Sequence, residues 1–461
     1  MNQTKFSLLP SVVILCLLYA VSIAVVFLSI VTEYKPDDGT GNLRLIIFLL
    51  LIPIIVKYLI QLTTTLFYSL VERFREAKGD CPLAPTVTVL IPAWNEEVGI
   101  IKTLNSVIDT QYNKLEIIVI NDGSTDGTHK LVTQFIDQFD KNNLANINIK
   151  YLPLMNGGKA KALNQGLKVA TGEFIVTIDA DSVMESNAIV NIIKRFTDDK
   201  VGAVAGNVII GNRRKPIEVM QQLEYLYGFF FKRADSTFNS VYIIGGAAAA
   251  YRKDVLLELG GFDHEIITED IEMSTRILAH GYNTRYAADA IIYTEGPSDW
   301  RGLCQQRLRW KFGRLLTFIK HRKLFFSFKK EHNSYLTFLL LPVAVYAELA
   351  LLFEAVLLSI FYGYTIYTSD YLPLVFLILF ITMVITLQII FDPKSGFHKN
   401  LLLLAPVAWI VFYIMDIVEF QALYRSLKLL IKRQNMEWQK WARVGLLGQL
   451  NAQTVVKADT K

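Results

Sequence analysis

The chain has 461 residues, of which 52% are hydrophobic, and its formal net charge is +5 at pH 7. The apolar fraction exceeds that of ordinary soluble domains and points to the lipid bilayer as a partner. The small net charge gives no indication of nucleic acid. The three cysteines, Cys16, Cys81 and Cys304, are too few and too far apart for a disulfide framework or a zinc site, and they fit a reducing cytosol.

Two apolar stretches near the N-terminus exceed the roughly 20 residues that a membrane-spanning helix needs. They cover residues 8–31 and about 45–70. The first is too long for the apolar part of a signal peptide and is closely followed by the second, so we expect two transmembrane helices within residues 1–70. The basic residues that follow, Arg73, Arg75 and Lys78, predict that the next segment is cytosolic.

Three further apolar stretches lie near the C-terminus, at about 335–363, 372–391 and 400–424. The layout predicts a cytosolic domain over residues 71–334, a membrane bundle over 335–424, and a tail over 425–461. The tail is rich in Lys and Arg and favours the cytosol, whereas three full crossings would place it outside. An interfacial or re-entrant segment would resolve this conflict, and acids that are costly against lipid mark the candidates: Glu348, Glu354, Asp416 and Glu419.

The expected cytosolic domain alternates between strand-like and helix-like stretches. Apolar, β-branched stretches end in polar turn residues at 86–97, 115–126, 148–158 and 173–182. Stretches with helical spacing follow the first three, at 100–110, 128–139 and 159–170. Continuous apolar strands separated by helices predict a Rossmann-like α/β fold, with a mostly parallel sheet and helices on both faces.

Polar residues follow each of these four strands. They are, in chain order, Glu96 with Glu97, Asp122, Lys159, and Asp179 with Asp181. In open parallel sheets ligands bind beyond the carboxyl ends of the strands, so we expect these side chains to share one site. Carboxylates without His or Cys suit Mg²⁺ or Mn²⁺ together with a phosphate ligand.

The sequence "DADS" places Asp179 and Asp181 two residues apart at the end of the fourth strand. On a strand both side chains would project from the same face, and two like charges side by side are costly without a cation or a counter-charge. A solvated loop would explain the pair without any site. Their position among the other strand ends favours half of a metal site.

Two competing motifs fail on their spacing. The sequence "MNGGKAKA" resembles a phosphate loop, but Pro153 stands at the first glycine position and Ala160 replaces the hydroxyl residue. The sequence "INDGSTDGT" lacks the length and the closing Glu of a calcium loop. Asp-Gly-Ser is also good turn chemistry. The turn does not need the side chain of Asp122, so we favour a turn that contacts a ligand.

Residues 242–282 contain a second group of candidates. Gly245 and Gly246, followed by four alanines, allow either a floor beneath a substrate or tight packing. Thr268 is the expected N-cap of a helix, and acids in a first helical turn, here Glu269 and Asp270, are favoured by the helix dipole without any catalytic role.

Residues 299–330 mix aromatic and basic residues just before the membrane. An interfacial amphipathic helix attracted to anionic lipid explains part of this stretch, and we expect that role for Lys320–Lys330. It does not explain Gln306, Arg309 and Trp310, whose i, i+3, i+4 spacing places them on one helix face. Arg suits phosphate oxygens, and Trp suits stacking on a sugar ring.

The motifs "PAWNEE", "NDGSTD", "NGGKAKALNQGL", "DADS", "TEDIEMS" and "QRLRW", in this order and between membrane spans, form a recognisable set. Over roughly residues 85–315 the chain resembles the membrane-embedded family 2 glycosyltransferases with a GT-A fold. It is most similar to the processive members, first the poly-N-acetylglucosamine synthases and then the hyaluronan, chitin and cellulose synthases. The sequence "GGAAAAYR" departs from the motif expected of the poly-N-acetylglucosamine synthases.

The resemblance implies roles for single residues. Trp94, Glu96 and Asp122 would hold the uridine of a UDP-sugar, and Lys159 would help to position the nucleotide. Asp179 and Asp181 would hold Mg²⁺ or Mn²⁺, Asp181 more directly. Asp270 would be the catalytic base, with Glu269 beside it, while Gln306, Arg309 and Trp310 would contact the diphosphate and the acceptor sugar.

The implied function is inverting transfer of a sugar, with N-acetylglucosamine favoured, from UDP to a growing β-linked glycan at the plasma membrane. Processive synthesis coupled to export, and a small membrane accessory subunit, would go with it. One alternative is transfer of a single sugar to a polyprenyl phosphate or another lipid. An alternative of a different class is a non-catalytic, glycan-binding scaffold in a secretion complex.

Overall fold

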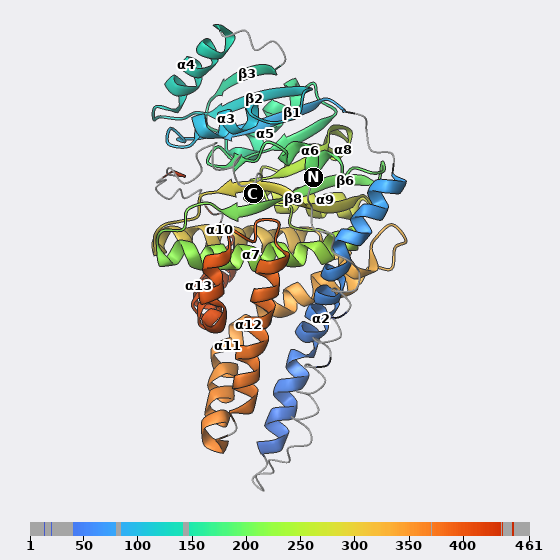
Figure 1. Ribbon diagram of the computed structural model, residues 1–461, viewed down its shortest axis with the longest axis vertical. Coiled ribbons are helices and arrows are strands. Elements are labelled where there is room, and N and C mark those ends of the chain that lie inside the picture. The colour runs from blue at the N-terminus through green and yellow to red at the C-terminus, as the bar shows by residue number, and fades with distance from the viewer. Residues whose placement is uncertain are drawn as a thin grey trace.

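The computed structural model describes residues 40–79, 84–141, 147–369 and 371–434, together with the single positions 13, 20, 436, 445 and 446. The first expected span, residues 8–31, and most of the tail therefore lie outside the described residues. An α/β domain occupies one end of the molecule, and long helices extend from it to the other end (Figure 1).

The described part of the domain is built on an eight-stranded sheet with the order β3-β2-β1-β4-β7-β6-β8-β5. The strands β1 to β4 pair in parallel, as the sequence predicts, whereas β7 is antiparallel to both of its neighbours, β4 and β6, and β5 is antiparallel to β8. The strands are β1 (Val87–Ala93), β2 (Leu115–Asp122), β3 (Ile147–Leu154), β4 (Phe174–Thr177), β5 (Val183–Met184), β6 (Val201–Ile210), β7 (Ala249–Arg252) and β8 (Asn283–Thr294).

Helices cover both faces of this sheet because the central strands are apolar on both sides. On β1, Val89 and Ile91 belong to one hydrophobic core, and Leu90 between them belongs to the other. The first core contains α3 (Ile100–Ile108), α4 (Thr128–Lys141) and α6 (Ala188–Ile193). The second contains α5 (Lys159–Val169), α8 (Lys253–Glu258) and α9 (Glu269–Ala279). The alternation of strands and helices expected over residues 86–182 is confirmed.

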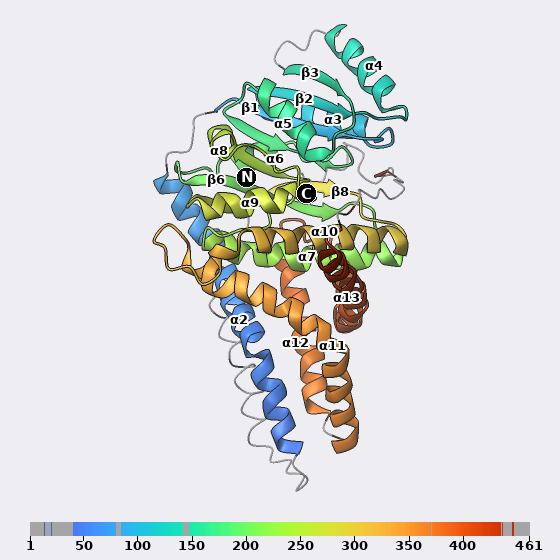
Figure 2. The ribbon, with the colours of Figure 1, turned by 180° about the vertical axis from the view of Figure 1, so that it is seen from behind.

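Two long helices form a layer between the sheet and the membrane-length helices, as Figures 1 and 2 show from opposite sides. They are α7 (Pro216–Thr237) and α10 (Trp300–Lys320). The expected interfacial helix over Lys320–Lys330 is wrong in extent, because α10 ends at Lys320 and the following residues contain only the 3₁₀ turn η1 (Arg322–Leu324). Asp299 explains the start of α10, since its carboxylate accepts a hydrogen bond from the Gly302 N–H at 2.9 Å.

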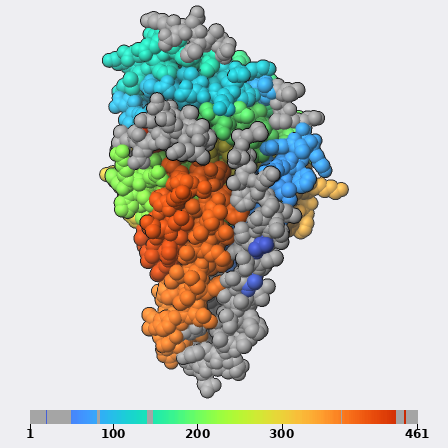
Figure 3. All heavy atoms as spheres, in the orientation of Figure 1, coloured from blue at the N-terminus to red at the C-terminus, as the bar shows by residue number. Residues whose placement is uncertain are grey.

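Four described helical segments are long and apolar enough to cross a membrane. They correspond to the second expected span and to the three C-terminal ones. They are Ile52–Lys78 within α2 (Thr40–Lys78), η2 with α11 (Tyr335–Leu340 and Leu341–Thr368), α12 (Leu372–Phe391), and η4 with α13 (Ala405–Val407 and Ala408–Lys432). In Figure 3 the orange and red atoms of the C-terminal helices lie against the green atoms of α7.

The segment between α12 and α13, which contains η3 (Lys399–Leu403), is docked on the α/β domain. Lys394 forms an ion pair with Glu185 at 2.8 Å, and the guanidinium of Arg213 lies 3.9 Å from the ring centroid of Phe397. The chain therefore leaves the domain along α11 and returns to it along α12. Beyond α13, the Gly445 N–H donates to Glu295 at 2.9 Å, so the chain is next to the domain both before and after α13.

Two of the four acids that the sequence marks in this region face α10. Lys311 of α10 lies 2.9 Å from a carboxylate oxygen of Glu348 on α11 and 2.6 Å from one of Glu419 on α13. Arg307, one turn earlier, pairs with Glu224 of α7 at 2.6 Å. These contacts join four helices through charges that would be costly if they faced lipid.

Candidate active site

A cavity of about 820 Å³ opens at the carboxyl ends of β1, β2 and β4 and continues between α7 and α10 as far as α2. It brings together every residue to which the family resemblance assigns a role. The cavity is lined by Trp94, Glu96, Asp122, Lys159, Asp179, Asp181, Glu269, Asp270, Gln306, Arg309 and Trp310. Glu97, expected at the first strand end, is exposed and instead accepts a hydrogen bond from the Gly127 N–H at 2.7 Å.

The loops after β1 and β2 are bonded to each other. Asn95 has a left-handed backbone (φ 57°), and its side-chain oxygen accepts a hydrogen bond from the Thr125 N–H at 2.7 Å. The Thr128 hydroxyl accepts from the Glu96 N–H at 2.8 Å. The polar residues of the loop after β2 thus fasten the loop that carries Trp94 and Glu96 at the cavity.

Asp122, the last residue of β2, is 5% exposed and uses both carboxylate oxygens to order a loop. They accept hydrogen bonds from the Gly157 and Gly158 N–H groups, each at 2.8 Å. Gly158 precedes α5 with φ at 92°, a conformation that favours glycine. Asp122 therefore holds the start of α5, and with it Lys159, in place. Its predicted contact with uridine stays a prediction.

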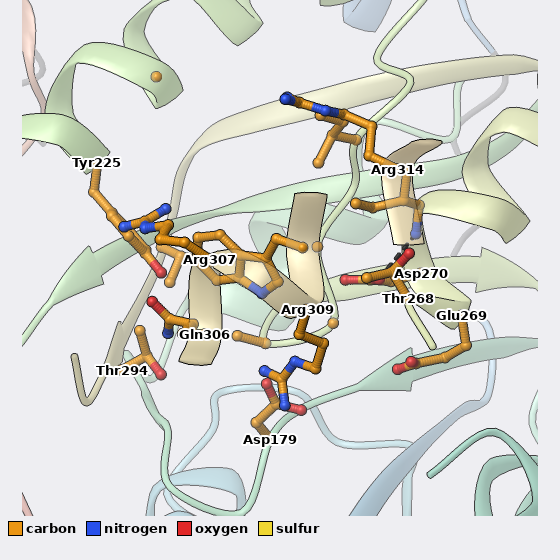
Figure 4. A pocket seen from close by; sticks show the side chains of 18 of the residues that line it. Asp179, Tyr225, Thr268, Glu269, Asp270, Thr294, Gln306, Arg307, Arg309 and Arg314 are labelled. Carbon is orange, nitrogen blue, oxygen red and sulfur yellow. Dashed lines mark hydrogen bonds between the residues drawn. The ribbon is translucent and has the colours of Figure 1, made fainter. Parts of the chain in front are cut away.

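Asp179 and Asp181 lie beyond the end of β4, in a turn that the Ser182 N–H closes on the Asp179 carbonyl at 3.0 Å. The expectation that they share a strand face is therefore wrong, although both line the cavity. The counter-charge is Lys159, whose ammonium lies 2.6 Å from an oxygen of Asp179. Figure 4 shows Arg309 pointing toward Asp179 from α10.

The donor set fits a metal only in part. Within the described residues no group of three or more His, Cys, Asp or Glu side chains could hold an ion. Asp179 and Asp181 offer carboxylate oxygens, which suit Mg²⁺ or Mn²⁺, and Mg²⁺ commonly completes its coordination with water and substrate phosphates. The residues therefore fit an ion that a phosphate ligand shares, rather than a site made by protein alone.

Lys159 also connects the two halves of the site. Its ammonium lies 3.1 Å from a carboxylate oxygen of Glu269, the first residue of α9. Burial raises the pKa of Glu269, Lys159 opposes this rise, and the neighbouring Asp270 carboxylate adds to it. A Cβ on Gly246 would lie 2.5 Å from the Lys159 nitrogen, so the glycine leaves room for the lysine between the acids.

Helix α9 begins as expected, but its N-cap differs from the prediction. Thr268 occupies the N-cap position without a side-chain hydrogen bond to the helix. Its side chain instead packs against α10, where a Cβ on Gly313 would lie 2.2 Å from the Thr268 hydroxyl oxygen. This close approach brings Asp270 on α9 and Trp310 on α10 to one cavity.

The spacing of Gln306, Arg309 and Trp310 on α10 has the expected result, because all three line the cavity. Figure 4 shows Gln306 and Arg309. Gln306 is 5% exposed, and within the described structure its side-chain oxygen has no hydrogen-bond partner. The ring centroids of Trp310 and Tyr225 lie 6.3 Å apart, and the Arg307 guanidinium lies 4.4 Å from the Trp310 ring centroid.

The sequence reasoning missed the wall that α7 and α2 supply. Residues of this wall that line the cavity include Lys57, Gln61, Glu224, Tyr225, Gly228, Lys232 and Asp235. The stretch 224–232, "EYLYGFFFK", has no motif that marks it as functional. Its one signal is a glycine within a short stretch that is rich in aromatic residues.

Comparison with known families then decides the class of this domain. The profile of the family described as "Glycosyltransferase like family 2" matches residues 84–313. This segment is a family 2 glycosyltransferase domain. The match ends inside α10, past Trp310, so the family 2 domain includes every predicted site residue. Together with the mostly parallel sheet, it confirms the expected GT-A fold.

Several curated proteins resemble the family 2 domain. Over 231 residues the chain is 35% identical to the poly-beta-1,6-N-acetyl-D-glucosamine synthase of Staphylococcus aureus (strain COL), covering 49% of this chain and 54% of the relative. The protein of the same name from Staphylococcus epidermidis is 31% identical over 275 residues, covering 58% and 64%. The chain thus spans little more than half the length of the first relative.

Solved structures are more distant. A mannosyltransferase from Pyrobaculum calidifontis in complex with GDP-Man and Mn2+ aligns over 84% of this chain and 100% of its own, with 22% identity and a TM-score of 0.48.

Proposed function

We propose that this protein is an inverting glycosyltransferase that adds N-acetylglucosamine from a UDP-sugar to a growing β-linked polysaccharide at the membrane. The observation that carries the proposal is the cavity itself. It holds the strand-end acids, the Lys159–Glu269 pair, Asp270 and the Gln306–Arg309–Trp310 face at once, within a family 2 domain. The similarity to poly-N-acetylglucosamine synthases favours N-acetylglucosamine as the sugar.

The residues divide the chemistry between them. Asp270 accepts the proton of an acceptor hydroxyl as its oxygen forms a bond to the anomeric carbon. The bond from that carbon to the phosphate oxygen breaks, and UDP leaves with the electron pair. A single displacement inverts the anomeric centre, so an α-linked donor gives a β-linked product. Arg309, which points toward Asp179, stabilises the negative charge on the leaving diphosphate (Figure 4).

Asp179 and Asp181 would hold Mg²⁺ or Mn²⁺ together with the diphosphate. A divalent ion bound there would neutralise the charge that develops on the leaving oxygen. Trp94, Glu96 and Asp122 line the cavity beyond β1 and β2 and would receive the uridine. Trp310, beside Tyr225, would stack on the acceptor sugar.

The proposed setting is the plasma membrane, with the family 2 domain in the cytosol. The docked segment between α12 and α13, and the contact of Gly445 with Glu295, favour α11 and α12 as a hairpin that crosses and returns. In this arrangement α13 lies at the interface and the basic tail stays cytosolic. Processive synthesis, export and an accessory subunit complete the proposal.

Labelling can test this topology. In a background without native cysteines, Ser369→Cys, after α11, and Lys399→Cys, before α13, should react with a membrane-impermeant thiol reagent from opposite sides of the membrane. Both positions are exposed in the structure. Reaction of both from the same side would contradict the hairpin.

Activity is tested with the purified full chain in a bilayer and a panel of UDP-sugars. Release of UDP from UDP-N-acetylglucosamine, with a polymer that resists alkali and yields glucosamine on acid hydrolysis, would support the proposal. A product with one sugar on a lipid would indicate the single-transfer alternative. Absence of UDP release from every donor would indicate the non-catalytic scaffold.

A further inference from the structure

Helix α7 presents one continuous face to the cavity. Tyr225, Gly228, Lys232 and Asp235 line the cavity at successive turns of this helix. Residues three and four apart lie on the same helical face, so these four side-chain positions form a stripe along the wall. Nothing in the family motifs assigns a role to this stripe.

Gly228 leaves an open space in this wall. Glycine inside a helix costs about 1 kcal/mol relative to alanine, so its presence usually has a packing reason. At Gly313 that reason is visible, because a Cβ there would collide with Thr268. At Gly228 a Cβ would meet no heavy atom of the described residues within 4 Å, and the position is exposed to the cavity. The glycine therefore keeps a volume free that the protein does not fill.

Lys232 lies one turn further along α7. Its nitrogen is 3.8 Å from the ring centroid of Phe229, and no ion pair with a carboxylate forms within the described part of the chain. Burial lowers the pKa of Lys232 to about 8, while Asp235 on α7 and Asp270 on α9 oppose this shift. The positive charge of Lys57 on α2 also attracts the carboxylate of Asp235. That carboxylate accepts hydrogen bonds from Gln61 and Tyr335. The amine therefore keeps hydrogen-bonding capacity toward the cavity.

The opposite wall of this space belongs to α10. Trp310 of this wall presents an aromatic face near Tyr225 of α7, and the Gln306 oxygen of α10 is a buried acceptor without a partner among the described residues. A pyranose ring has an apolar face that suits aromatic rings, and hydroxyl and amide groups at its edge that suit a lysine and an amide. The groups around this space therefore suit an uncharged sugar unit.

We propose that Gly228 and Lys232 form an acceptor subsite on α7, where Gly228 leaves room for a sugar ring and Lys232 donates hydrogen bonds to its oxygens. The proposal rests on the proposed function and deepens it, since it names two residues that select the acceptor. The ligand class is an uncharged, N-acetylated, β-linked sugar chain whose end lies next to Asp270.

Gly228 is tested by filling the space it leaves. In the full chain in a bilayer, Gly228→Ala should raise the KM for an added N-acetylglucosamine oligosaccharide, and Gly228→Leu should raise it about tenfold or more. The matched control is Gly363→Ala on α11, an exposed helical glycine that also lacks neighbours within 4 Å and does not line the cavity. Alanine favours helix over glycine, so both alanine variants should melt at or above the wild-type temperature.

Lys232 is tested by removing its donor at constant length. Lys232→Met should raise the KM for the same oligosaccharide at least about tenfold, which is the lower end of the cost of a lost hydrogen bond to a charged group. Lys232→Arg should restore most of the affinity. The affinity for UDP, measured by calorimetry, should stay within about twofold of wild type, because Lys232 is not among the residues expected to contact the uridine or the diphosphate.

The outcomes separate this inference from the proposed function. If the wild-type protein releases no UDP from any UDP-sugar, the proposed function is wrong. If the wild type is active but Gly228→Leu and Lys232→Met keep the wild-type KM for the oligosaccharide, the subsite is wrong and the function stands. If UDP affinity falls with acceptor affinity, α7 serves the donor and the assignment to the acceptor is wrong.

Discussion

Removal of the charge of Lys311 should destabilise the protein more than removal of any exposed charge. The Lys311 side chain is 4% exposed, and its ammonium lies between Glu348 at 2.9 Å and Glu419 at 2.6 Å. Loss of one partner of a buried ion pair costs about 3–5 kcal/mol, because the remaining charge stays buried without compensation. Arg314 still contacts Glu348, and the Arg307 Nε lies 3.8 Å from Glu419, so we expect the lower end of this range, about 3 kcal/mol.

The assay is thermal unfolding of the purified protein in one detergent, with Lys311→Met against the matched variant Lys329→Met. Lys329 pairs with Glu331 at 3.2 Å, but the two side chains are 69% and 54% exposed. Exposed pairs contribute about 0–1 kcal/mol, so Lys329→Met should melt close to wild type. The double variant Lys311→Met with Glu348→Gln should be less destabilised than the sum of its parts. If Lys311→Met and Lys329→Met had the same melting temperature, the stabilising role of the network would be refuted.

Three further predictions concern the chemistry. Asp270→Asn should lower turnover about 10²- to 10⁴-fold with UDP affinity retained, and near wild-type turnover would remove Asp270 as the base. Chelation by EDTA should abolish UDP release, and Mg²⁺ or Mn²⁺ should restore it; full activity in EDTA would remove the metal role of Asp179 and Asp181. Because the pKa of Lys232 is lowered to about 8, its charged ammonium, with three N–H donors, is present below that pH and is replaced by the neutral amine, a weaker donor, as pH rises through it. The KM for the oligosaccharide should therefore rise above about pH 8 in wild type but not in Lys232→Arg, and equal profiles would contradict the argument.

The strands and the donor side of the cavity could be predicted because their signals are local. Continuous apolar stretches predict parallel strands, and the carboxyl ends of parallel strands meet at one edge whatever the details of packing. That rule alone brings Glu96, Asp122 and Asp179 together. The spacing of Gln306, Arg309 and Trp310 is likewise a property of any helix.

The remaining features depend on contacts between distant segments. The side chain of Thr268 meets Gly313 instead of capping α9, and helical propensity carries no information about that neighbour. Asp179 lies in a turn rather than on a strand. Its counter-charge comes from Lys159, twenty residues earlier in the chain. The wall formed by α7 has no motif, and only its packing below the sheet places Gly228 and Lys232 at the cavity.

The underside of α7 and α10 limits how this protein can be shortened. Leu223 and Leu226 of α7 are buried against Ile385 and Ile389 of α12, and Leu303 of α10 is buried against Met415 of α13. The family match stops at residue 313, in the middle of α10. A fragment cut at that point would expose these apolar side chains and an incomplete α10 to water. Production of a soluble catalytic fragment would require extension past Lys320 and polar replacements along that surface.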